Sequence, residues 1–458
     1  ATVSDGVVEQ AFTYDTRDWE DPKKTPHLPF LNDRVQTTIF QFGSRDPFIS
    51  EYRKEIDQAG NITAYTHANV TEAETPETGK AVTRLRVACL RDQGFSVSAR
   101  IFILAMGAIE IPRLLLLSNK TRASGLGNPH DLVGRFFMEH PHIWSGEYVP
   151  SGPALLDSTR LYRAHTVGDV PIMGKLTISR EVLRRERMLN YCVSMHPEIS
   201  SSRRNVVTTL PVLSWPLLTA QPQQTSAGRL QPQEKRPQGV ESLKVLLSSM
   251  SRGRVPENLF GHLGNVISDM DSVAAAGYKR IQAKSARIGK HLRTSRGRLV
   301  FKLNHMTEQS PNPNSRVTLS HEKDPFGRNR VCLDWRVVPL DLRSIIRAQE
   351  IIDEELQRAG LGRLKIELTD EIPCPTLEGG WHHMGTTRMH RDPGKGVVDE
   401  NCRVHGVHNL FIAGPSVFPT CGFANPVLTS VALAARLSDH IKHSLKRASF
   451  PVKTGEDS

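Results

Sequence analysis

The sequence has few cysteines, few aromatic residues and no long hydrophobic run. No stretch of the 458 residues approaches the roughly 18 consecutive apolar residues of a membrane-spanning helix. The six cysteines are scattered without a Cys-x-x-Cys pair, so a zinc ribbon, a thioredoxin-type motif and a c-type haem attachment are not expected. We predict no membrane span and no metal site, and the sequence indicates no cellular compartment.

The overall composition is that of a globular protein. Hydrophobic residues make up 38% and charged residues 23% of the chain, which excludes collagen-like, coiled-coil and wholly disordered chains. The length corresponds to about three average domains, or to one large enzyme subunit with an inserted second domain.

The net charge is +11, and much of it comes from one segment. Residues 279–298 contain eight basic side chains and no acid, and Arg280, Lys284 and Arg287 recur at helical spacing. Such a face is usually solvated, but it could also contact a membrane surface, a nucleic acid or an acidic protein. Aromatic residues make up only 6% of the chain, so few side chains could stack on bases, and we predict no nucleic-acid partner.

Residues 61–119 show the pattern of an α/β domain. Strands are predicted over 62–70 and 83–89, separated by the polar, turn-rich run 72–80. Because the residues that follow also alternate between strand and helix patterns, we expect a sheet with covering helices.

A short apolar strand over 101–105 is followed directly by a glycine turn and a helix. The turn is Met106-Gly107, and the helix is predicted over 108–117 with Pro112 in its first turn. Nucleotide-binding sheets use this arrangement, because their ligands lie at the carboxyl ends of the strands. We therefore expect a ligand at this turn.

The middle region, 141–375, has a different composition and sequence pattern. Residues 216–239 are rich in proline, glutamine and other polar residues, which predicts a mobile loop. Strands are predicted over 315–320 and 330–335, and an amphipathic helix over 342–356. This region is predicted to form a second, sheet-based domain.

The last region, 376–458, returns to the pattern of the first. A buried strand is predicted over 409–414, and a helix over 427–445 with leucine and isoleucine side chains on one face. A chain that leaves a sheet and comes back to it completes the same domain.

The densest group of chemically active side chains lies in residues 379–389. His382 could accept a proton near neutral pH, and the amide of Asn425 could hydrogen-bond the same oxygen. Asn425 is also expected to cap the last helix with Pro426 at its first position, so that the positive end of the helix would point at a ligand. Alternatively, His382 and His383 are structural and Asn425 is an ordinary cap.

The order of several segments, together with their amino-acid sequences, resembles that of the glucose-methanol-choline (GMC) family of flavin-dependent oxidoreductases. The resemblance covers most of the chain. The segments that carry it are 103–118, 125–128, 131–141, 311–320, 382–389, 409–419 and 424–429. The resemblance implies an α/β fold: a Rossmann-like FAD-binding domain, incomplete in this chain, formed by residues 1–140 and 376–458, and a second, sheet-based substrate domain over 141–375.

The resemblance also implies the catalytic residues. The catalytic histidine of the family falls on His382 and not on His383, and its partner position falls on Asn425. The histidine would take the proton of a substrate hydroxyl while hydride passes from the same carbon to flavin N5. Trp381, next to this base, could stack on a sugar ring or could be ordinary packing.

FAD is the cofactor that the resemblance implies. The backbone of Val70 would lie against the adenine. The other implied cofactor-binding residues are Ala105, Met106 and Gly107 along the dinucleotide, and Ala413, Gly414, Asn425, Pro426 and Thr429 around the ribityl chain and flavin. Small residues suit these positions because the backbone must approach the cofactor closely.

One expected part of the family pattern is missing. No Gly-x-Gly-x-x-Gly turn, which would hold the dinucleotide pyrophosphate, is present: Gly125-Leu-Gly127 lacks the third glycine. The family segment that can attach flavin to a histidine is also missing. The chain could be the carboxyl part of a longer enzyme, a partner chain could supply the first βαβ unit, or the chain could have lost flavin.

The main hypothesis is FAD-dependent oxidation of an alcohol to a carbonyl, with a secondary hydroxyl of a sugar or glycoside as the expected substrate. A flavin-containing lyase that uses His382 for acid–base cleavage remains an alternative. So does a non-catalytic binding protein that docks through residues 279–298. The electron acceptor, which could be oxygen, a quinone or a cytochrome, and the oligomeric state stay open.

Overall fold

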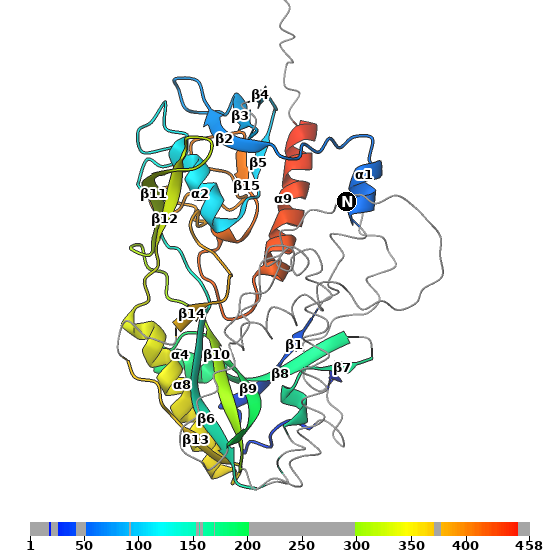
Figure 1. Ribbon diagram of the computed structural model, residues 1–458, viewed down its shortest axis with the longest axis vertical. Helices are drawn as coiled ribbons and strands as arrows, with labels where there is room; N and C mark the ends of the chain where they lie inside the picture. The colour runs from blue at the N-terminus through cyan, green and yellow to red at the C-terminus, as the bar shows by residue number, and fades with distance from the viewer. Residues whose placement is uncertain are drawn as a thin grey trace, which may run out of the picture. The chain divides into compact units, whose positions relative to one another are not determined.

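A computed structural model describes most of the chain (Figure 1). The described residues are 18–19, 26–42, 52–90, 93–152, 155, 159–168, 170–200, 298–370 and 377–447. Contacts divide the chain into two units, residues 1–198 with 300–458 and residues 199–299, and nearly all described residues belong to the first. The predicted loop 216–239 lies outside the described residues, as does the basic segment 279–298 apart from the backbone of Arg298.

The predicted strand, glycine turn and helix are present. Strand β5 (Phe102–Leu104) leads into helix α2 (Gly107–Leu117), and β5 pairs in parallel with β15 (Leu410–Ile412). The backbone N–H of Ala413 donates to the carbonyl of Leu104 at 2.8 Å, which extends this pairing to the ends of both strands. The chain therefore returns to its first sheet as the sequence predicts, and the α/β fold class is confirmed.

Pro112 lies one turn later than predicted. Because α2 begins at Gly107, Pro112 is in the second turn, where its missing N–H would leave the carbonyl of Ala108 without its usual helical donor. The hydroxyl of Thr386, a fully buried residue, donates to that carbonyl at 2.7 Å. The proline is therefore tolerated because a distant side chain replaces the lost helical bond.

Three antiparallel strands form a small separate sheet. They are β2 (Asn69–Glu74), β3 (Arg84–Ala88) and β4 (Gly94–Val97). The predicted strand at 62–70 was wrong in its position, since β2 starts only at Asn69 and runs through Glu74. The acidic residues Glu72 and Glu74 belong to the strand because neighbouring basic side chains pair with them: Arg84 and Arg86 with Glu74, and Lys120 with Glu72 at 2.9 Å.

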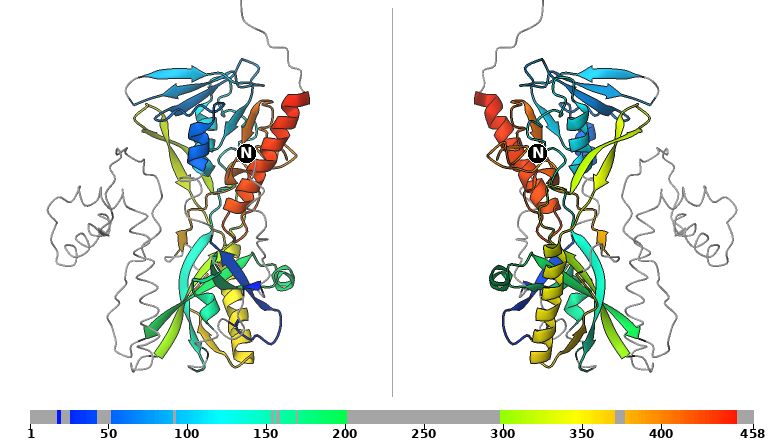
Figure 2. Two further views of the ribbon diagram at one scale, coloured as in Figure 1. Left: turned by 90° about the vertical axis from the view of Figure 1, so that its right-hand side faces the viewer. Right: turned by 90° about the vertical axis from the view of Figure 1, so that its left-hand side faces the viewer.

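The largest sheet has eight strands, with the order β1-β8-β9-β10-β6-β13, while β14 pairs with β6 and β7 with β8. Helix α8 (Pro339–Arg358) contacts both β1 and β13. The views in Figure 2 show α8 and these strands together. The strands are β1 (Val35–Gln41), β6 (Pro141–Pro150), β7 (His165–Val167), β8 (Val170–Ile178), β9 (Tyr191–Ser200), β10 (Arg298–Thr307), β13 (Gly362–Lys365) and β14 (Leu377–Gly379).

Two strands join this sheet from outside the range 141–375. They are β1, from residues 1–140, and β14, from residues 376–458. The predicted strands near 315–320 and 330–335 are present as the hairpin β11 (Arg316–Lys323) and β12 (Asn329–Asp334), which packs against α2. In the described part of the chain, segments from outside 141–375 therefore contribute strands to the eight-stranded sheet, and a hairpin from inside that range packs against α2.

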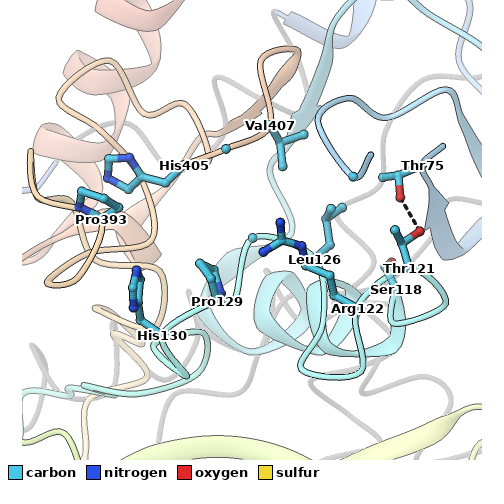
Figure 3. Close-up of a pocket in the computed structure, with 13 residues that line it drawn as sticks. Thr75, Ser118, Thr121, Arg122, Leu126, Pro129, His130, Pro393, His405 and Val407 are labelled. Atoms are coloured by element: carbon cyan, nitrogen blue, oxygen red, sulfur yellow. Dashed lines mark hydrogen bonds between the residues drawn. The ribbon is translucent and has the colours of Figure 1, made fainter. Parts of the chain in front are cut away.

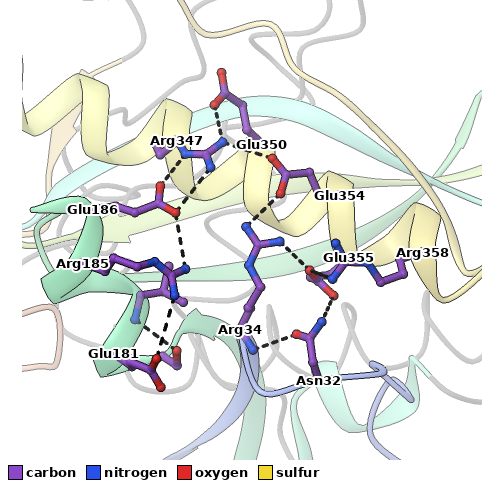
Figure 4. Close-up of polar contacts among 12 residues, drawn as sticks. Asn32, Arg34, Glu181, Arg185, Glu186, Arg347, Glu350, Glu354, Glu355 and Arg358 are labelled. Carbon is purple, nitrogen blue, oxygen red and sulfur yellow. Dashed lines mark hydrogen bonds and ion pairs between the residues drawn. The ribbon is translucent and has the colours of Figure 1, made fainter.

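A network of charged side chains holds α8 in place (Figure 4). Arg34 pairs with Glu354 at 2.8 Å and with the fully buried Glu355 at 2.7 Å. Glu355 also accepts from Asn32 at 2.6 Å and pairs with Arg358 at 2.8 Å. Since a buried carboxylate is costly unless it is paired, Arg34 and its neighbours stabilise the contact between α8 and the segment before β1.

Helix α9 (Val427–Arg447) buries only part of its apolar stripe. Leu437 and Ile441 are buried in the core that surrounds β5 and β15. The first turns of the helix instead expose apolar side chains: Val427, Leu428 and Val431 are each more than half exposed. In the described part of the chain, no helix is long and apolar enough to cross a membrane.

Candidate functional site

A backbone pairing between β6 and β14 determines where His382 lies. Gly379 of β14 faces Pro141 of β6, and beyond the strands Met138 and Met384 exchange two backbone hydrogen bonds of 3.0 Å. The segment from 379 to 384 is longer than the facing segment from 138 to 141, so its extra residues bulge out. This bulge contains Trp381 with a φ of 60°, and it places His382 against the residue that directly precedes β6.

That residue is His140. Its Nδ1 lies 3.0 Å from Nδ1 of His382, and the two rings meet edge to face with centroids 4.9 Å apart. His140 is fully buried, and its Nε2 lies 3.4 Å from the carbonyl oxygen of Cys421. Burial, and then the neighbouring His382, lowers the pKa of His140 to about 3, so this imidazole is neutral at physiological pH.

His382 itself is half-buried. Burial lowers its pKa, and the nearby His383 and Lys175 lower it further. A neutral imidazole with one nitrogen held by His140 can accept a proton at the other nitrogen. The arrangement therefore suits a general base.

Two glycines leave room for this pair of imidazoles. A Cβ at Gly380 would lie 2.6 Å from Nε2 of His142 and 3.2 Å from Nδ1 of His382. A Cβ at Gly379 would lie 2.6 Å from a carboxyl oxygen of Glu139. The glycines of the sequence Gly379-Gly-Trp-His-His383 are therefore required by the close packing of the neighbouring side chains.

Glu139 places a buried carboxyl group beside the same loop. Burial raises its pKa to about 7, although the backbone N–H groups of Trp381, His382 and His140 act in the opposite direction. Its Oε1 is buried and has no hydrogen-bond partner among the described residues. The carboxyl group is therefore partly protonated near neutral pH, which reduces the cost of leaving that oxygen unpaired.

A buried lysine lies beside the site, and burial lowers the pKa of its amino group. Lys175 is only 8% exposed, its Nζ lies 3.9 Å from the centre of the Phe40 ring, and no acidic side chain in the described ranges pairs with it. Burial, and then the neighbouring Lys175, lowers the pKa of both His142 and His196 to about 4. The histidines around His382 are thus held in their neutral forms.

The predicted cofactor-binding residues gather in part at the ends of two parallel strands. Ala105, Met106 and Gly107 follow β5, and Ala413 and Gly414 follow its partner β15. Gly107 and Gly414 have φ angles of 78° and 127°, and an added Cβ at either would meet nothing within 4 Å. Among the described residues, no side chain caps the start of α2 at Met106, which leaves the first N–H groups of that helix available to a ligand.

Val70 lies in β2, opposite Val87, and packs against the core that contains β5 and β15. Helix α2 packs against β2. Val70 therefore lies next to the strand, turn and helix formed by β5 and α2, although it belongs to a different sheet.

Asn425, Pro426 and Thr429 lie at the start of α9. Pro426 is buried and its carbonyl accepts from the N–H of Ser430 at 2.9 Å, while Asn425 and Thr429 are exposed. Within the described residues, no hydrogen bond joins Asn425 to His382. The structure instead pairs His382 with His140, a residue of the segment 131–141 for which no local sequence signal indicates a role in the site.

A surface pocket of about 310 Å³ lies elsewhere, with Arg122, His130 and His405 in its wall (Figure 3). Thr75 and Thr121 share a 2.8 Å hydrogen bond at one side of it. None of the predicted catalytic or cofactor-binding residues lines this pocket. A search of the described residues also finds no group of three or more His, Cys, Asp or Glu side chains that could hold a metal ion.

Part of the chain is similar to a known protein family. Residues 311–434 match the family model described as GMC oxidoreductase. The chain is 25% identical to the fructose dehydrogenase large subunit of Gluconobacter japonicus over 361 residues, which is 78% of this chain and 49% of that protein.

Two further relatives match over shorter segments. Paromamine 6'-oxidase of Streptomyces fradiae is 30% identical over 138 residues, which is 30% of this chain and 25% of that protein. C-glycoside 3-oxidase of Arthrobacter globiformis is 35% identical over 127 residues, which is 27% of this chain and 23% of that protein. The chain thus aligns with about half, or less, of the length of these curated relatives.

Proposed function

We propose that the chain, which matches the GMC oxidoreductase family model over residues 311–434, acts as a member of that family in the FAD-dependent oxidation of an alcohol to a carbonyl compound. The observation that carries the proposal is the 3.0 Å contact that holds the half-buried His382 against the buried His140. A base held in this way has its second ring nitrogen available for a substrate hydroxyl.

The residues at the ends of β5 and β15 fit a dinucleotide. The glycine backbones at Gly107 and Gly414 have open space where a Cβ would be, which allows close approach. The uncapped start of α2 offers N–H groups and the positive end of a helix dipole to a phosphate. We propose that Val70, Ala105, Met106, Gly107, Ala413, Gly414, Asn425, Pro426 and Thr429 contact FAD. Bound FAD would supply a hydride acceptor.

His382 would take the proton of the substrate hydroxyl. Burial, and then the neighbouring His383 and Lys175, lowers its pKa, which favours the neutral imidazole that can accept that proton. Asn425 would orient the substrate oxygen from the start of α9. This second role rests on the resemblance and on the exposed position of Asn425.

For the substrate, we propose a secondary hydroxyl of a sugar or glycoside. The names of three relatives, fructose dehydrogenase, paromamine 6'-oxidase and C-glycoside 3-oxidase, support this class. Trp381 is 56% exposed and directly precedes His382, so its ring could stack on the apolar face of a pyranose.

We further propose that another polypeptide segment completes the FAD site, either in a longer chain or in a partner subunit. Ile103 and Met106 near the end of β5 and Val427, Leu428 and Val431 on α9 are exposed apolar side chains that such a segment would cover. One relative is named as a large subunit, which supports the partner-subunit alternative.

The test is a visible absorption spectrum of the purified protein, with its intact mass and any co-purifying chain, followed by anaerobic addition of sugars and glycosides. The proposal predicts flavin bands that bleach with substrate. Turnover without bleaching would indicate a lyase instead. A colourless protein that binds no added FAD, with or without co-purified chains, would contradict the proposal.

A further inference from the structure

We propose that His140 is a positioning residue that fixes the tautomer of His382, so that Nδ1 of His382 carries the hydrogen and Nε2 carries the free lone pair. The inference rests on the proposed function, because it assigns the proton-accepting atom of the proposed base. It follows from the hydrogen-bond partners of His140, which is fully buried and can satisfy its two ring nitrogens in only one way.

The first step concerns Nε2 of His140. This atom lies 3.4 Å from the carbonyl oxygen of Cys421, which can only accept a hydrogen bond. If Nε2 carried no hydrogen, two lone pairs would face each other in a buried site and neither would be satisfied. Nε2 of His140 therefore carries the hydrogen and donates it to Cys421.

The second step concerns the charge of His140. The ionisable groups around it are His142, Lys175, His382 and Glu139, and the first three would repel a positive charge. Glu139 is itself largely uncharged below neutral pH because burial raises its pKa to about 7. His140 is therefore neutral, and a neutral imidazole with hydrogen on Nε2 has a bare Nδ1.

The third step transfers this constraint to His382. The bare Nδ1 of His140 lies 3.0 Å from Nδ1 of His382, so the hydrogen between them belongs to His382. In a neutral His382, the remaining nitrogen, Nε2, is then unprotonated. When a substrate hydroxyl loses its proton, the O–H bond breaks and a new N–H bond forms at Nε2, while the Nδ1–H of His382 continues to donate to His140.

The backbone keeps the two rings in this relation. The Met138–Met384 backbone pair and the Gly379–Pro141 register fix the chain on both sides of the contact. Because residue 380 is glycine, it has no side chain that would collide with His382 and His142. A pair of imidazoles held by two strands in this way is pre-organised, so little reorganisation is needed when the proton moves.

The test is ¹⁵N NMR of the full chain with labelled histidine rings, in which the signals of His382 are assigned by their loss in His382→Ala. In the wild-type chain we expect Nδ1 of His382 to be protonated and Nε2 to be bare at pH 6.5, where Glu139 is still mostly uncharged. In His140→Phe, which offers no acceptor, the preference for the Nδ1–H tautomer is expected to disappear. In His140→Asn the side-chain amide oxygen can accept at nearly the same place, and the preference is expected to return.

Two results would overturn the inference: a His382 ring protonated at Nε2 in the wild-type chain, or an unchanged tautomer in His140→Phe. The wild-type spectrum decides the question even if His140→Phe does not fold. In the flavin-containing enzyme, His140→Phe is expected to slow substrate-driven flavin reduction about 10–100-fold, as for other residues that orient a reactive imidazole, with rescue by Asn. If His382→Ala leaves flavin reduction unchanged, the proposed function fails, whatever the tautomer of His382.

Discussion

Thr386 donates its hydroxyl hydrogen to the carbonyl oxygen of Ala108, the acceptor that Pro112 leaves without a helical donor. The contact joins the loop after His382 to the first turn of α2, whose start lies at the predicted dinucleotide turn. Thr387 makes a second link, at 2.8 Å, to Ser416 after β15. The His-x-x-Gly-Thr sequence therefore connects the candidate base to the candidate cofactor-binding turns.

Replacing Thr386 by valine is expected to lower the free energy of unfolding by about 1–2 kcal/mol, because a buried carbonyl loses its partner. In a Pro112→Ala background, residue 112 regains an N–H that can donate to Ala108, so the same replacement is expected to cost less than about 0.5 kcal/mol. Urea denaturation of the four proteins measures both values. An equal cost of Thr386→Val in the two backgrounds would show that the proline does not create the need for Thr386.

The close packing around Gly380 gives a second prediction. Gly380→Ala would place a methyl group 2.6 Å from Nε2 of His142, so we expect a loss of about 1–3 kcal/mol in stability and a displaced His382 ring. Gly60→Ala is the matched control, because nothing lies within 4 Å of an added Cβ there. Denaturation curves and the NMR signals of His382 report the two effects. Equal behaviour of the two variants would contradict the packing described here.

Glu139 should make stability depend on pH. Its folded-state pKa is about 7, above the ordinary value of 4.5, so between these values the folded protein binds more protons than the unfolded chain. The free energy of unfolding is then expected to fall by about 3 kcal/mol from pH 4.5 to pH 8 through this group. Glu139→Gln lacks this contribution, and the difference between the wild-type and variant proteins across the pH range isolates it. A difference that stays constant with pH would refute the raised pKa.

The network on α8 provides a stability prediction far from the histidines. Arg34→Met removes a partner of the fully buried Glu355, which keeps Arg358 and Asn32, so we expect a loss of about 1–3 kcal/mol. Arg185→Met serves as the control, because Arg185 is 55% exposed and its long pairs, with Glu181 at 3.9 Å and with Glu186 at 3.7 Å, should together contribute less than about 0.5 kcal/mol (Figure 4). Guanidinium denaturation compares them. Similar losses in the two variants would mean that burial of Glu355 does not matter.

Local sequence patterns predicted those secondary-structure elements whose formation depends mainly on neighbouring residues. The strand, glycine turn and helix around Gly107 follow from a short apolar run and a helical pattern in adjacent residues. The position of β2 could not be predicted in this way, because Glu72 and Glu74 look like loop residues until Arg84, Arg86 and Lys120 neutralise them. Such pairing depends on strand register, which a single strand does not specify.

The candidate site could be predicted only in part, because its contacts also depend on strand register. His382 stands in a distinctive sequence, but its partner His140 is 242 residues away and is brought close only by the register of β6 and β14. The sequence does not show that Lys175 is buried either, because the Phe40 ring that it contacts belongs to β1, which is far away in the sequence and pairs with β8 in the same sheet. The pairing of His382 with Asn425 remains a prediction.

The most direct test of the account is the rate of flavin reduction by substrate in His382→Ala, measured anaerobically by stopped-flow absorbance on the flavin-containing enzyme with every chain that it requires. His383→Ala is the matched control, since the two histidines are adjacent and both half-buried. The account predicts that His382→Ala retains flavin but loses reduction by at least about 100-fold, in the range of general-base catalysis, and that His383→Ala stays within tenfold of wild type. Equal rates of flavin reduction in His382→Ala and the wild-type enzyme would contradict the account.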